Sequence, residues 1–282
     1  MLAFLGMGLL GSNFVRALRK RGEAVQVWNR SPEKAQALAP IGAVPQADVA
    51  VAVRGAQRIH ITLSDDAAVD DVLERARPGF ATGVTIIDHT TTSPACTRER
   101  AQRWAERGVA FQHAPVFMGP QNALESSGVM LASGDKARFD QLSAELSKMT
   151  GKLVYLGPEP ERAASFKLLG NSFLMFLTAG LTDYLGLAKS LGISAQDATS
   201  LFQQWNPAVT LPGRVARILE AQWSQPSWEL VMARKDARLM LEAAAQGGQE
   251  LHVLPQIAKL MDAYIARGHS HDDWTVVAKD NL

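Results

Sequence analysis

Residues 2–11 read Leu2-Ala3-Phe4-Leu5-Gly6-Met7-Gly8-Leu9-Leu10-Gly11 and place three glycines directly after a short apolar run. The apolar run predicts a buried strand over residues 2–5. Residues 10–21 predict the following helix, because Phe14, Val15 and Leu18 fall on one helical face. The glycines between them have the spacing G-x-G-x-x-G. A loop with this spacing, between a strand and a helix, is typical of a dinucleotide site.

Each glycine of this loop has a separate physical task. Gly6 allows a tight turn, Gly8 lets the backbone approach a pyrophosphate, and Gly11 lets the helix pack on the strand. The helix N-terminus offers free N–H groups and a partial positive charge to phosphates. An ordinary glycine-rich turn is the alternative, and the compact strand–helix–strand context favours the cofactor site. The predicted contacts are Gly6, Met7, Gly8, Leu9, Leu10 and Gly11.

The residues after the second predicted strand (24–28) bear on the choice of cofactor. An NAD site usually places Asp or Glu there to bind the ribose hydroxyls. This chain has Trp28-Asn29-Arg30-Ser31-Pro32, followed by Lys34. Arg30 can hold a 2′-phosphate through its planar fork, with hydrogen bonds from Asn29 and Ser31 and a further charge from Lys34. Arg30 as a solvated loop cation is the alternative. We therefore expect NADP(H).

The rest of the first half alternates strands and helices. Strands are predicted at residues 58–63, 85–88 and 109–113, and helices at 32–38, 67–76 and 94–106. This alternation predicts a parallel, doubly wound sheet. After about Tyr155 nearly everything has helical character. We expect an α/β Rossmann domain over residues 1–158 and an all-α domain over residues 159–282, which begins with a long helix at about 163–191.

The bulk composition excludes several classes of function. The chain has 282 residues and a net charge of +1, with charges of both signs interspersed. No field therefore attracts nucleic acid or an anionic membrane. The lone Cys96 rules out an internal disulfide and suits a reducing cytoplasm. Residues 163–191 are apolar but carry Lys167, Asp183 and Lys189, so we interpret them as a buried helix rather than a membrane span.

Other polar residues carry weaker signals. The histidines near the end of the chain, His252, His269 and His271, lie close to Asp272 and Asp273. Their spacing is not that of a helical metal-binding pair, so no metal site is expected. The first ten residues lack a basic leader and contain the glycine motif, so we expect no secretory signal.

Several further motifs resemble one family, the β-hydroxyacid dehydrogenases, which include 3-hydroxyisobutyrate dehydrogenase and glyoxylate or succinic semialdehyde reductases. The similar segments include residues 63–69, 88–94, 113–119, the pair Lys235-Asp236 and residues 268–273. The resemblance covers nearly the whole chain and implies a homo-oligomer, either a dimer or a tetramer. It also implies cofactor contacts from Leu63, Ser64, Val69, Thr91 and Lys235.

Lys167 and Asn171 match the catalytic lysine of this family and its asparagine four residues later. Lys167 lies in an otherwise apolar stretch, where burial lowers the pKa of a lysine toward neutrality. Four-residue spacing places both side chains on one helical face. Reduction of a carbonyl needs a hydride and a proton, and Lys167 is the candidate proton donor. An ordinary lysine whose stem packs at a domain edge is the alternative.

The substrate motif departs from the family pattern. The family's Ser-Gly-Gly, which binds a carboxylate, is replaced by Phe117-Met118-Gly119, and the acid that begins the motif is replaced by His113. The predicted substrate residues Val116, Phe117, Met118 and Gly119 thus form a more apolar wall, unless Phe117 and Met118 are plain core residues. We expect a reductase of small carbonyl compounds. Imine reduction and a non-catalytic NADP(H) sensor are the alternatives.

Overall fold

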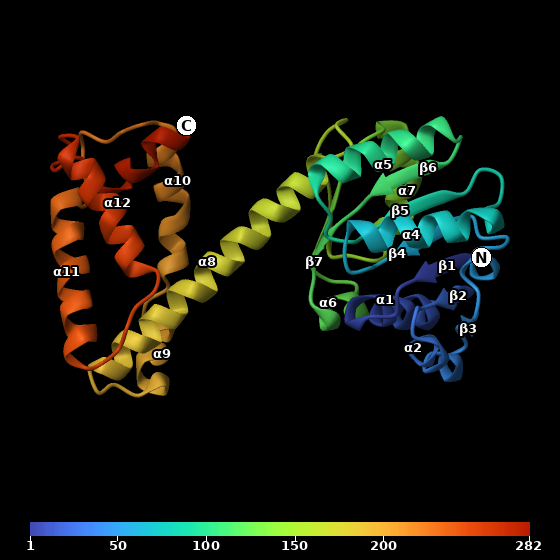
Figure 1. Ribbon diagram of the computed structural model, residues 1–282, viewed down its shortest axis with the longest axis horizontal. Coiled ribbons are helices and arrows are strands. Elements are labelled where there is room, and N and C mark those ends of the chain that lie inside the picture. Colours follow the sequence, from blue (N-terminus) through green and yellow to red (C-terminus); the bar gives the residue numbers. More distant parts are fainter. The chain divides into compact units, whose positions relative to one another are not determined.

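The structure is a computed structural model that describes residues 1–282, and the chain divides into two compact units, Met1–Asn171 and Ser172–Leu282. Both predicted architectures are confirmed: the first unit is α/β and the second is helical (Figure 1). The division falls inside the long helix α8 (Arg162–Ser190). The domain boundary expected after residue 158 stays a prediction.

A parallel six-stranded sheet forms the centre of the first unit. Its strands are β1 (Leu2–Leu5), β2 (Val25–Trp28), β3 (Val44–Pro45), β4 (Arg58–Ile61), β5 (Thr85–Asp88) and β6 (Ala110–His113). They lie in the order β3-β2-β1-β4-β5-β6, and every neighbouring pair is parallel. The order reverses direction between β1 and β4, which is where doubly wound sheets bind ligands at the carboxyl ends of their strands. The glycine loop follows β1 at this point.

Helices cover both faces of the sheet, which explains why its strands are continuously apolar. The helices between the strands are α1 (Leu9–Lys20), α2 (Pro32–Gln36), α3 (Val49–Ala52), α4 (Asp66–Ala76) and α5 (Pro94–Glu106). Adjacent strand residues therefore enter different cores. Phe4 and Ile87 pack in the core that contains α1, whereas Leu5 and Ile86 pack in the core that contains α4.

A second, three-stranded sheet extends the first unit, and the sequence analysis did not anticipate it. It contains β7 (Val116–Phe117), β8 (Val129–Ala132) and β9 (Lys152–Tyr155) in the order β7-β8-β9. The connecting helices are α6 (Pro120–Glu125) and α7 (Lys136–Ser147). Strand β7 is antiparallel to β8, whereas β9 is parallel to it. The predicted substrate segment therefore begins as a short strand, with Val116 and Phe117 held by β8.

The second unit contains the remaining helices. These are the rest of α8, then α9 (Ala195–Gln204), α10 (Leu211–Leu219), α11 (Leu230–Gln246) and α12 (Leu254–Ala266), with 3₁₀ turns at Pro207–Thr210 and Trp274–Asn281. Its core contains Leu230 and Met261. The carboxylate of Asp183 accepts hydrogen bonds from three successive backbone N–H groups, those of residues 252–254, and so fixes the start of α12 to α8.

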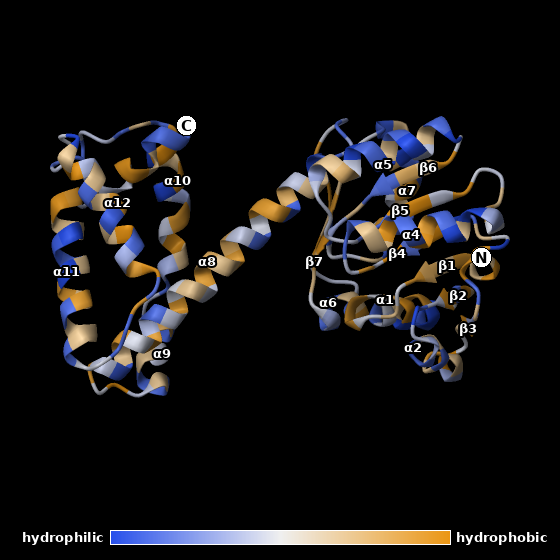
Figure 2. Ribbon diagram, in the orientation of Figure 1, coloured by the Kyte–Doolittle hydropathy of each residue, from blue (hydrophilic) through white to orange (hydrophobic).

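Helix α8 corrects one sequence-based expectation, because it is not buried in the single chain. By length and composition it is apolar enough to cross a membrane, and only 11% of its most apolar window is buried. Its exposed side chains include Phe173, Leu174, Met175, Phe176 and Leu177. Hydrophobic residues recur along the whole helix in Figure 2. Hydropathy alone could not reveal this exposure, because it does not say what covers an apolar helix.

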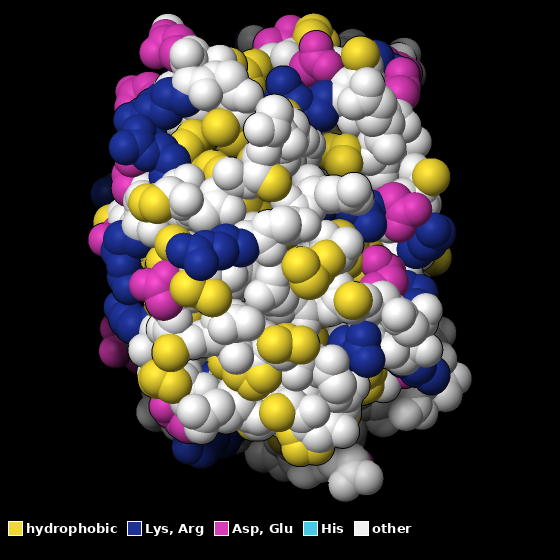
Figure 3. Space-filling model, turned by 90° about the vertical axis from the view of Figure 1, so that its right-hand side faces the viewer, with side chains coloured by type: hydrophobic (Ala, Val, Ile, Leu, Met, Phe, Trp, Pro, Cys, Tyr) yellow, Lys and Arg dark blue, Asp and Glu magenta, His cyan; other side chains and the backbone are white.

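Charged side chains of both signs are mixed over the face of the molecule in Figure 3, with apolar side chains between them. This agrees with the net charge of +1. No single-sign patch dominates this face, so it offers no broad electrostatic attraction to a polyanion.

Candidate functional site

The glycine loop has the backbone geometry that a phosphate cradle requires. Gly6 has φ +97°, and a Cβ there would lie 2.0 Å from the carbonyl oxygen of Thr62. A Cβ on Gly11 would lie 2.0 Å from the carbonyl oxygen of Gly6. Both positions therefore exclude any side chain. A Cβ on Gly8 would meet nothing within 4 Å, so the space beside this residue is open.

Gly8 is also the N-cap of α1, and no side chain caps this helix. The first N–H groups of a helix have no partner within the helix, and they carry its partial positive charge. The residues that carry them, Gly8 to Gly11, line a cavity. The chain therefore presents backbone donors to an anion at this point, which fits the pyrophosphate of a dinucleotide.

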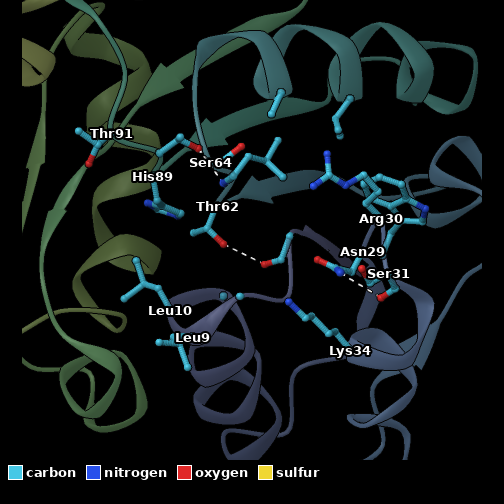
Figure 4. A pocket seen from close by; sticks show the side chains of 18 of the residues that line it. Leu9, Leu10, Asn29, Arg30, Ser31, Lys34, Thr62, Ser64, His89 and Thr91 are labelled. Atoms are coloured by element: carbon cyan, nitrogen blue, oxygen red, sulfur yellow. Dashed lines mark hydrogen bonds between the residues drawn. The ribbon is translucent and has the colours of Figure 1, made fainter.

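The predicted 2′-phosphate residues lie across the same cavity from the residues that follow β5. Figure 4 shows Arg30, Ser31 and Lys34 on one side, and His89 and Thr91 on the other. Asn29 has a structural task as well. Its Oδ1 accepts a hydrogen bond from the N–H of Met7 (2.8 Å), and its Nδ2 donates to the carbonyl of Ser31 (3.0 Å). Asn29 thus ties the phosphate loop to the loop that carries Arg30.

One cavity of about 590 Å³ brings most of the predicted site together. The predicted residues that line it come from six separate segments of the first unit. They are Gly6, Gly8, Leu9, Leu10, Gly11, Asn29, Arg30, Ser31, Lys34, Leu63, Ser64, Thr91, Val116, Met118 and Lys167.

Six predicted residues do not line this cavity. Met7 and Val69 are buried in the two cores of the first unit. Lys235 belongs to the second unit, where its ammonium pairs with Asp236 at 2.9 Å. The other three are Phe117, Gly119 and Asn171, which lie in β7, at the start of α6 and in α8. Of these, Phe117 and Asn171 both contact Lys167, which does line the cavity.

The cavity also contains residues that the sequence analysis missed: Trp28, Thr62, Ala68, Asp71, Val72, Arg75, His89 and Thr90. Arg75 is the most informative of them, because its guanidinium lies over the ring of Trp28, 5.5 Å from the centroid. It adds a third cation to Arg30 and Lys34. The four-residue spacing of Asp71 and Arg75 on α4 is visible in the sequence. The contact of Arg75 with Trp28 of β2 is not, because only the folded chain brings the two elements together.

Lys167 is nearly buried, with 9% of its surface exposed. Its Nζ donates a hydrogen bond to Oδ1 of Asn171 at 2.9 Å and lies 4.3 Å from the centroid of the Phe117 ring. Burial lowers the pKa of this lysine below its ordinary value. A lysine with a lowered pKa gives up its proton more readily at neutral pH, which suits a general acid.

A buried histidine pair lies at the wall of the cavity, where His89 lines it. Nδ1 of His60 and Nε2 of His89 are 3.0 Å apart, and Nδ1 of His89 lies 2.7 Å from the carbonyl oxygen of Ala114. A carbonyl only accepts hydrogen bonds, so Nδ1 of His89 carries a proton and Nε2 accepts one from His60. Burial lowers the pKa of His89 to about 4 and that of His60 well below its ordinary value.

His113, which replaces the acid of the family motif, lies beside Asp88 with an Nδ1–Oδ2 separation of 3.7 Å. Both side chains are buried, and Arg100 lies 4.0 Å from the same carboxylate oxygen. Burial raises the pKa of Asp88, but the neighbouring His113 ring and hydrogen bonds from Thr90 outweigh it and lower this pKa. No group of three or more His, Cys, Asp or Glu side chains has an arrangement that would hold a metal ion.

Comparison with known proteins places this geometry in a family. The family model for the NAD binding domain of 6-phosphogluconate dehydrogenase matches residues 1–157. The chain belongs to this family. The phosphate loop, the Arg30 segment and the cavity walls up to Met118 all fall within the matched part, so residues 1–157 are an NAD(P)-binding domain of the oxidoreductase type.

Two curated relatives show how the family likeness extends beyond this domain. Cytokine-like nuclear factor N-PAC from Gallus gallus is 31% identical over 275 residues, which cover 93% of this chain and 47% of that protein. The chain therefore spans about half the length of the N-PAC proteins that it matches. The chloroplastic glyoxylate/succinic semialdehyde reductase 2 from Arabidopsis thaliana is 24% identical over 282 residues, covering 98% of this chain and 78% of that protein.

Among solved structures, the imine reductase from Myxococcus stipitatus in complex with NADP⁺ has the same fold, with a TM-score of 0.92 at 20% identity and 99% coverage of both chains. The family model and the Arabidopsis reductase confirm the predicted resemblance to the β-hydroxyacid dehydrogenases, and the imine reductase shows that its fold is shared.

Proposed function

We propose that this protein is an NADP(H)-dependent oxidoreductase of the β-hydroxyacid dehydrogenase type, which transfers a hydride between NADPH and a small carbonyl or hydroxy compound. One observation supports this proposal above the others. A phosphate loop, a cluster of cations and a desolvated lysine all line a single cavity. A dinucleotide needs the first two, and the chemistry of carbonyl reduction needs the third.

The preference for NADP(H) rests on the chemistry of the loop after β2. Arg30 and Lys34 line the cavity together with Ser31, and Arg75 reaches the same end from α4. Guanidinium and ammonium groups bind a phosphate dianion, whereas the hydroxyls of an unphosphorylated ribose are best bound by a carboxylate. Asp71 lines the cavity and pairs with Arg75 at 3.2 Å, so these two charges compensate each other and the proposed preference rests on Arg30 and Lys34.

The cofactor supplies the hydride when it is bound. The first turn of α1 would hold its phosphates, and the Arg30 loop would hold its adenosine end. Lys167 delivers the proton to the developing alkoxide, and its lowered pKa assists the transfer. Oδ1 of Asn171 accepts a hydrogen bond from Nζ of Lys167 and so holds the ammonium in a fixed position beside α8. In the direction of alcohol oxidation the same lysine acts as the base.

The substrate wall of this cavity is apolar. Val116 and Met118 line it, and Met118 also packs against the core of the first unit. The hydroxyl that would bind a carboxylate in the family motif is absent, because Phe117 stands at that position. Such a wall favours a substrate with less charge and more hydrocarbon than a small hydroxy acid.

The experiment that tests the function measures NADPH oxidation across a panel of aldehydes, ketones and imines. Small hydroxy acids are assayed in the reverse direction, by reduction of NADP⁺. We expect turnover with hydrophobic aldehydes or ketones to exceed turnover with three- or four-carbon semialdehydes. Faster turnover of the small semialdehydes would refute the apolar substrate wall. A panel in which only imines turn over would favour the imine reductase alternative, although Lys167 favours the dehydrogenase chemistry.

The sensor alternative makes a different prediction on the same panel. A sensor binds NADPH tightly and turns over nothing, so calorimetric binding without oxidation of any substrate would support it. Lys167 and Asn171 argue against a sensor, because a protein that only binds the cofactor has no need of a desolvated proton donor.

We also propose a homo-oligomer in which a second copy of the chain covers α8. The apolar side chains of residues 173–177 are all exposed, and five successive residues cover every face of a helix. An exposed apolar surface of this kind marks an interaction site. Sedimentation of the wild type should give a dimer or tetramer. Leu174→Glu together with Phe176→Glu should release monomers, and an unchanged mass would contradict the proposal. The cytoplasmic location stays a prediction.

A further inference from the structure

Phe117 occupies an unusual position beside the proposed proton donor. Its ring centroid lies 4.3 Å from Nζ of Lys167, a distance at which a cation is attracted to the face of an aromatic ring. The only other polar contact of this ammonium is the 2.9 Å hydrogen bond to Asn171. Desolvation alone accounts for the lowered pKa of Lys167, so no carboxylate offsets the loss of water.

The helix that carries Lys167 is shaped to receive this ring. A Cβ built on Gly170 would lie 2.2 Å from Cζ of Phe117 and 2.5 Å from Cε1. No side chain at position 170 can coexist with the ring in this place. Gly170 lies between Lys167 and Asn171 in α8, so the ring rests on the helix beside both polar residues. A glycine inside a helix is less favourable than alanine, and here the space that it leaves is filled by Phe117.

We propose that Phe117 is a positioning residue, whose ring holds the ammonium of Lys167 beside Asn171, and that Gly170 is the residue that admits the ring to α8. This inference rests on the proposed function, because it assigns the ring a task in the delivery of the proton. A lysine side chain has four rotatable bonds, and one hydrogen bond leaves most of them free. The ring face and the amide oxygen together hold the ammonium from two sides.

Four variants separate this task from simple packing. Phe117→Leu keeps an apolar side chain and removes the ring face, whereas Phe117→Tyr keeps the ring. Gly170→Ala leaves Phe117 unchanged but displaces its ring through the 2.2 Å overlap. The double variant Phe117→Leu/Gly170→Ala removes the ring atoms that the new methyl group would meet.

We expect Phe117→Leu to lower kcat about 2- to 30-fold, the factor that a cation–π contact of ordinary strength carries, while the Kd for NADPH stays within about twofold of the wild type. Gly170→Ala should resemble Phe117→Leu, and Phe117→Tyr should retain most of the turnover. The double variant should be no slower than Phe117→Leu, because both changes remove the same contact. Additive losses in the double variant would contradict the shared role.

The titration of Lys167 provides a readout that does not depend on turnover. The lysines are dimethylated with ¹³C-formaldehyde, and the signal of Lys167 is assigned by its loss in Lys167→Ala. Loss of the ring face disfavours the ammonium, so the pKa of Lys167 should fall in Phe117→Leu and recover in Phe117→Tyr. If the wild type reduces none of the substrates in the panel but this titration behaves as expected, the proposed function fails, whereas the contact by which the Phe117 ring holds the Lys167 ammonium stands. An unchanged titration in Phe117→Leu would overturn the inference, whatever the turnover.

Discussion

The buried pair His60 and His89 makes the stability of the first unit depend on pH in a way that can be calculated. Both rings are buried, and the hydrogen bonds to Ala114 and from His60 require His89 to be neutral, because Nε2 of His89 accepts one of them. Protonation of His89 would place a second proton in the 3.0 Å contact, whereas protonation of His60 at Nε2 would leave a buried charge beside it, and two charged rings at this distance would repel each other. Burial is the main cause of the lowered pKa of both histidines.

The sign and size of the effect follow from linkage. An unfolded histidine has a pKa near 6.5, whereas the pKa of His89 in the folded chain is about 4. Between these two values the unfolded chain binds more protons, so stability is fully present above pH 6.5 and is lost as the pH falls toward 4. One pKa unit corresponds to about 1.4 kcal/mol, so His89 alone accounts for about 3 kcal/mol over this range.

The test replaces His89 with glutamine, which does not titrate. Loss of its hydrogen bonds should destabilise the unit by about 1–3 kcal/mol at pH 8. The free energy of unfolding should then fall less steeply between pH 6.5 and 4.5 than in the wild type, by up to about 1.4 kcal/mol per pH unit. Unfolding by urea is measured by pulsed hydrogen exchange. Peptides from β1 and β5 report on the first unit, which contains the histidine pair.

His271→Gln is the matched control for this experiment, because the side chain of His271 is 82% exposed. This variant should keep the slope of the wild type. A His89→Gln chain that loses stability as steeply as the wild type below pH 6.5 would refute the assignment of the acid sensitivity to the histidine pair.

Three further predictions concern the proposed site. Arg30→Ala should raise the Kd for NADPH about 10- to 100-fold and that for NADH by much less, and equal losses in calorimetry would remove the assignment of the 2′-phosphate. Lys167→Ala should lower kcat about 10²- to 10⁴-fold at nearly constant NADPH affinity, and a variant that keeps most of its turnover would exclude the lysine as acid. Gly11→Ala should lower both Tm and cofactor affinity, because its methyl group would lie 2.0 Å from the Gly6 carbonyl oxygen, and normal binding of NADPH would contradict the cradle.

The sequence predicted those parts of the fold whose signals are local. The strands at residues 2–5 and 85–88 have the predicted bounds, because apolar runs between turns mark them clearly. The small sheet β7-β8-β9 was missed. Its first strand has only two residues, and its pairing joins segments that lie far apart in the chain. Short apolar runs of this kind do not reveal their partners.

The same distinction applies to the site. The phosphate loop could be predicted because its strand, turn and helix are contiguous. The contact of Arg75 with Trp28 and the pairing of His60 with His89 could not, because each joins two elements that only the folded sheet brings together. The expected burial of α8 is not met within the single chain, because hydropathy measures how strongly a helix avoids water and does not show what covers it.

The position of Lys167 near the start of α8 has a consequence for how the site works. The first turn of α8 is fixed to the first unit, since the N–H of Ala163 donates a hydrogen bond to Oγ of Ser133 at 2.8 Å and Ala163 and Ala164 are buried. Phe117 and the phosphate loop belong to the same unit. The proposed proton donor, the residue proposed to position it and the phosphate loop therefore all belong to the same compact unit.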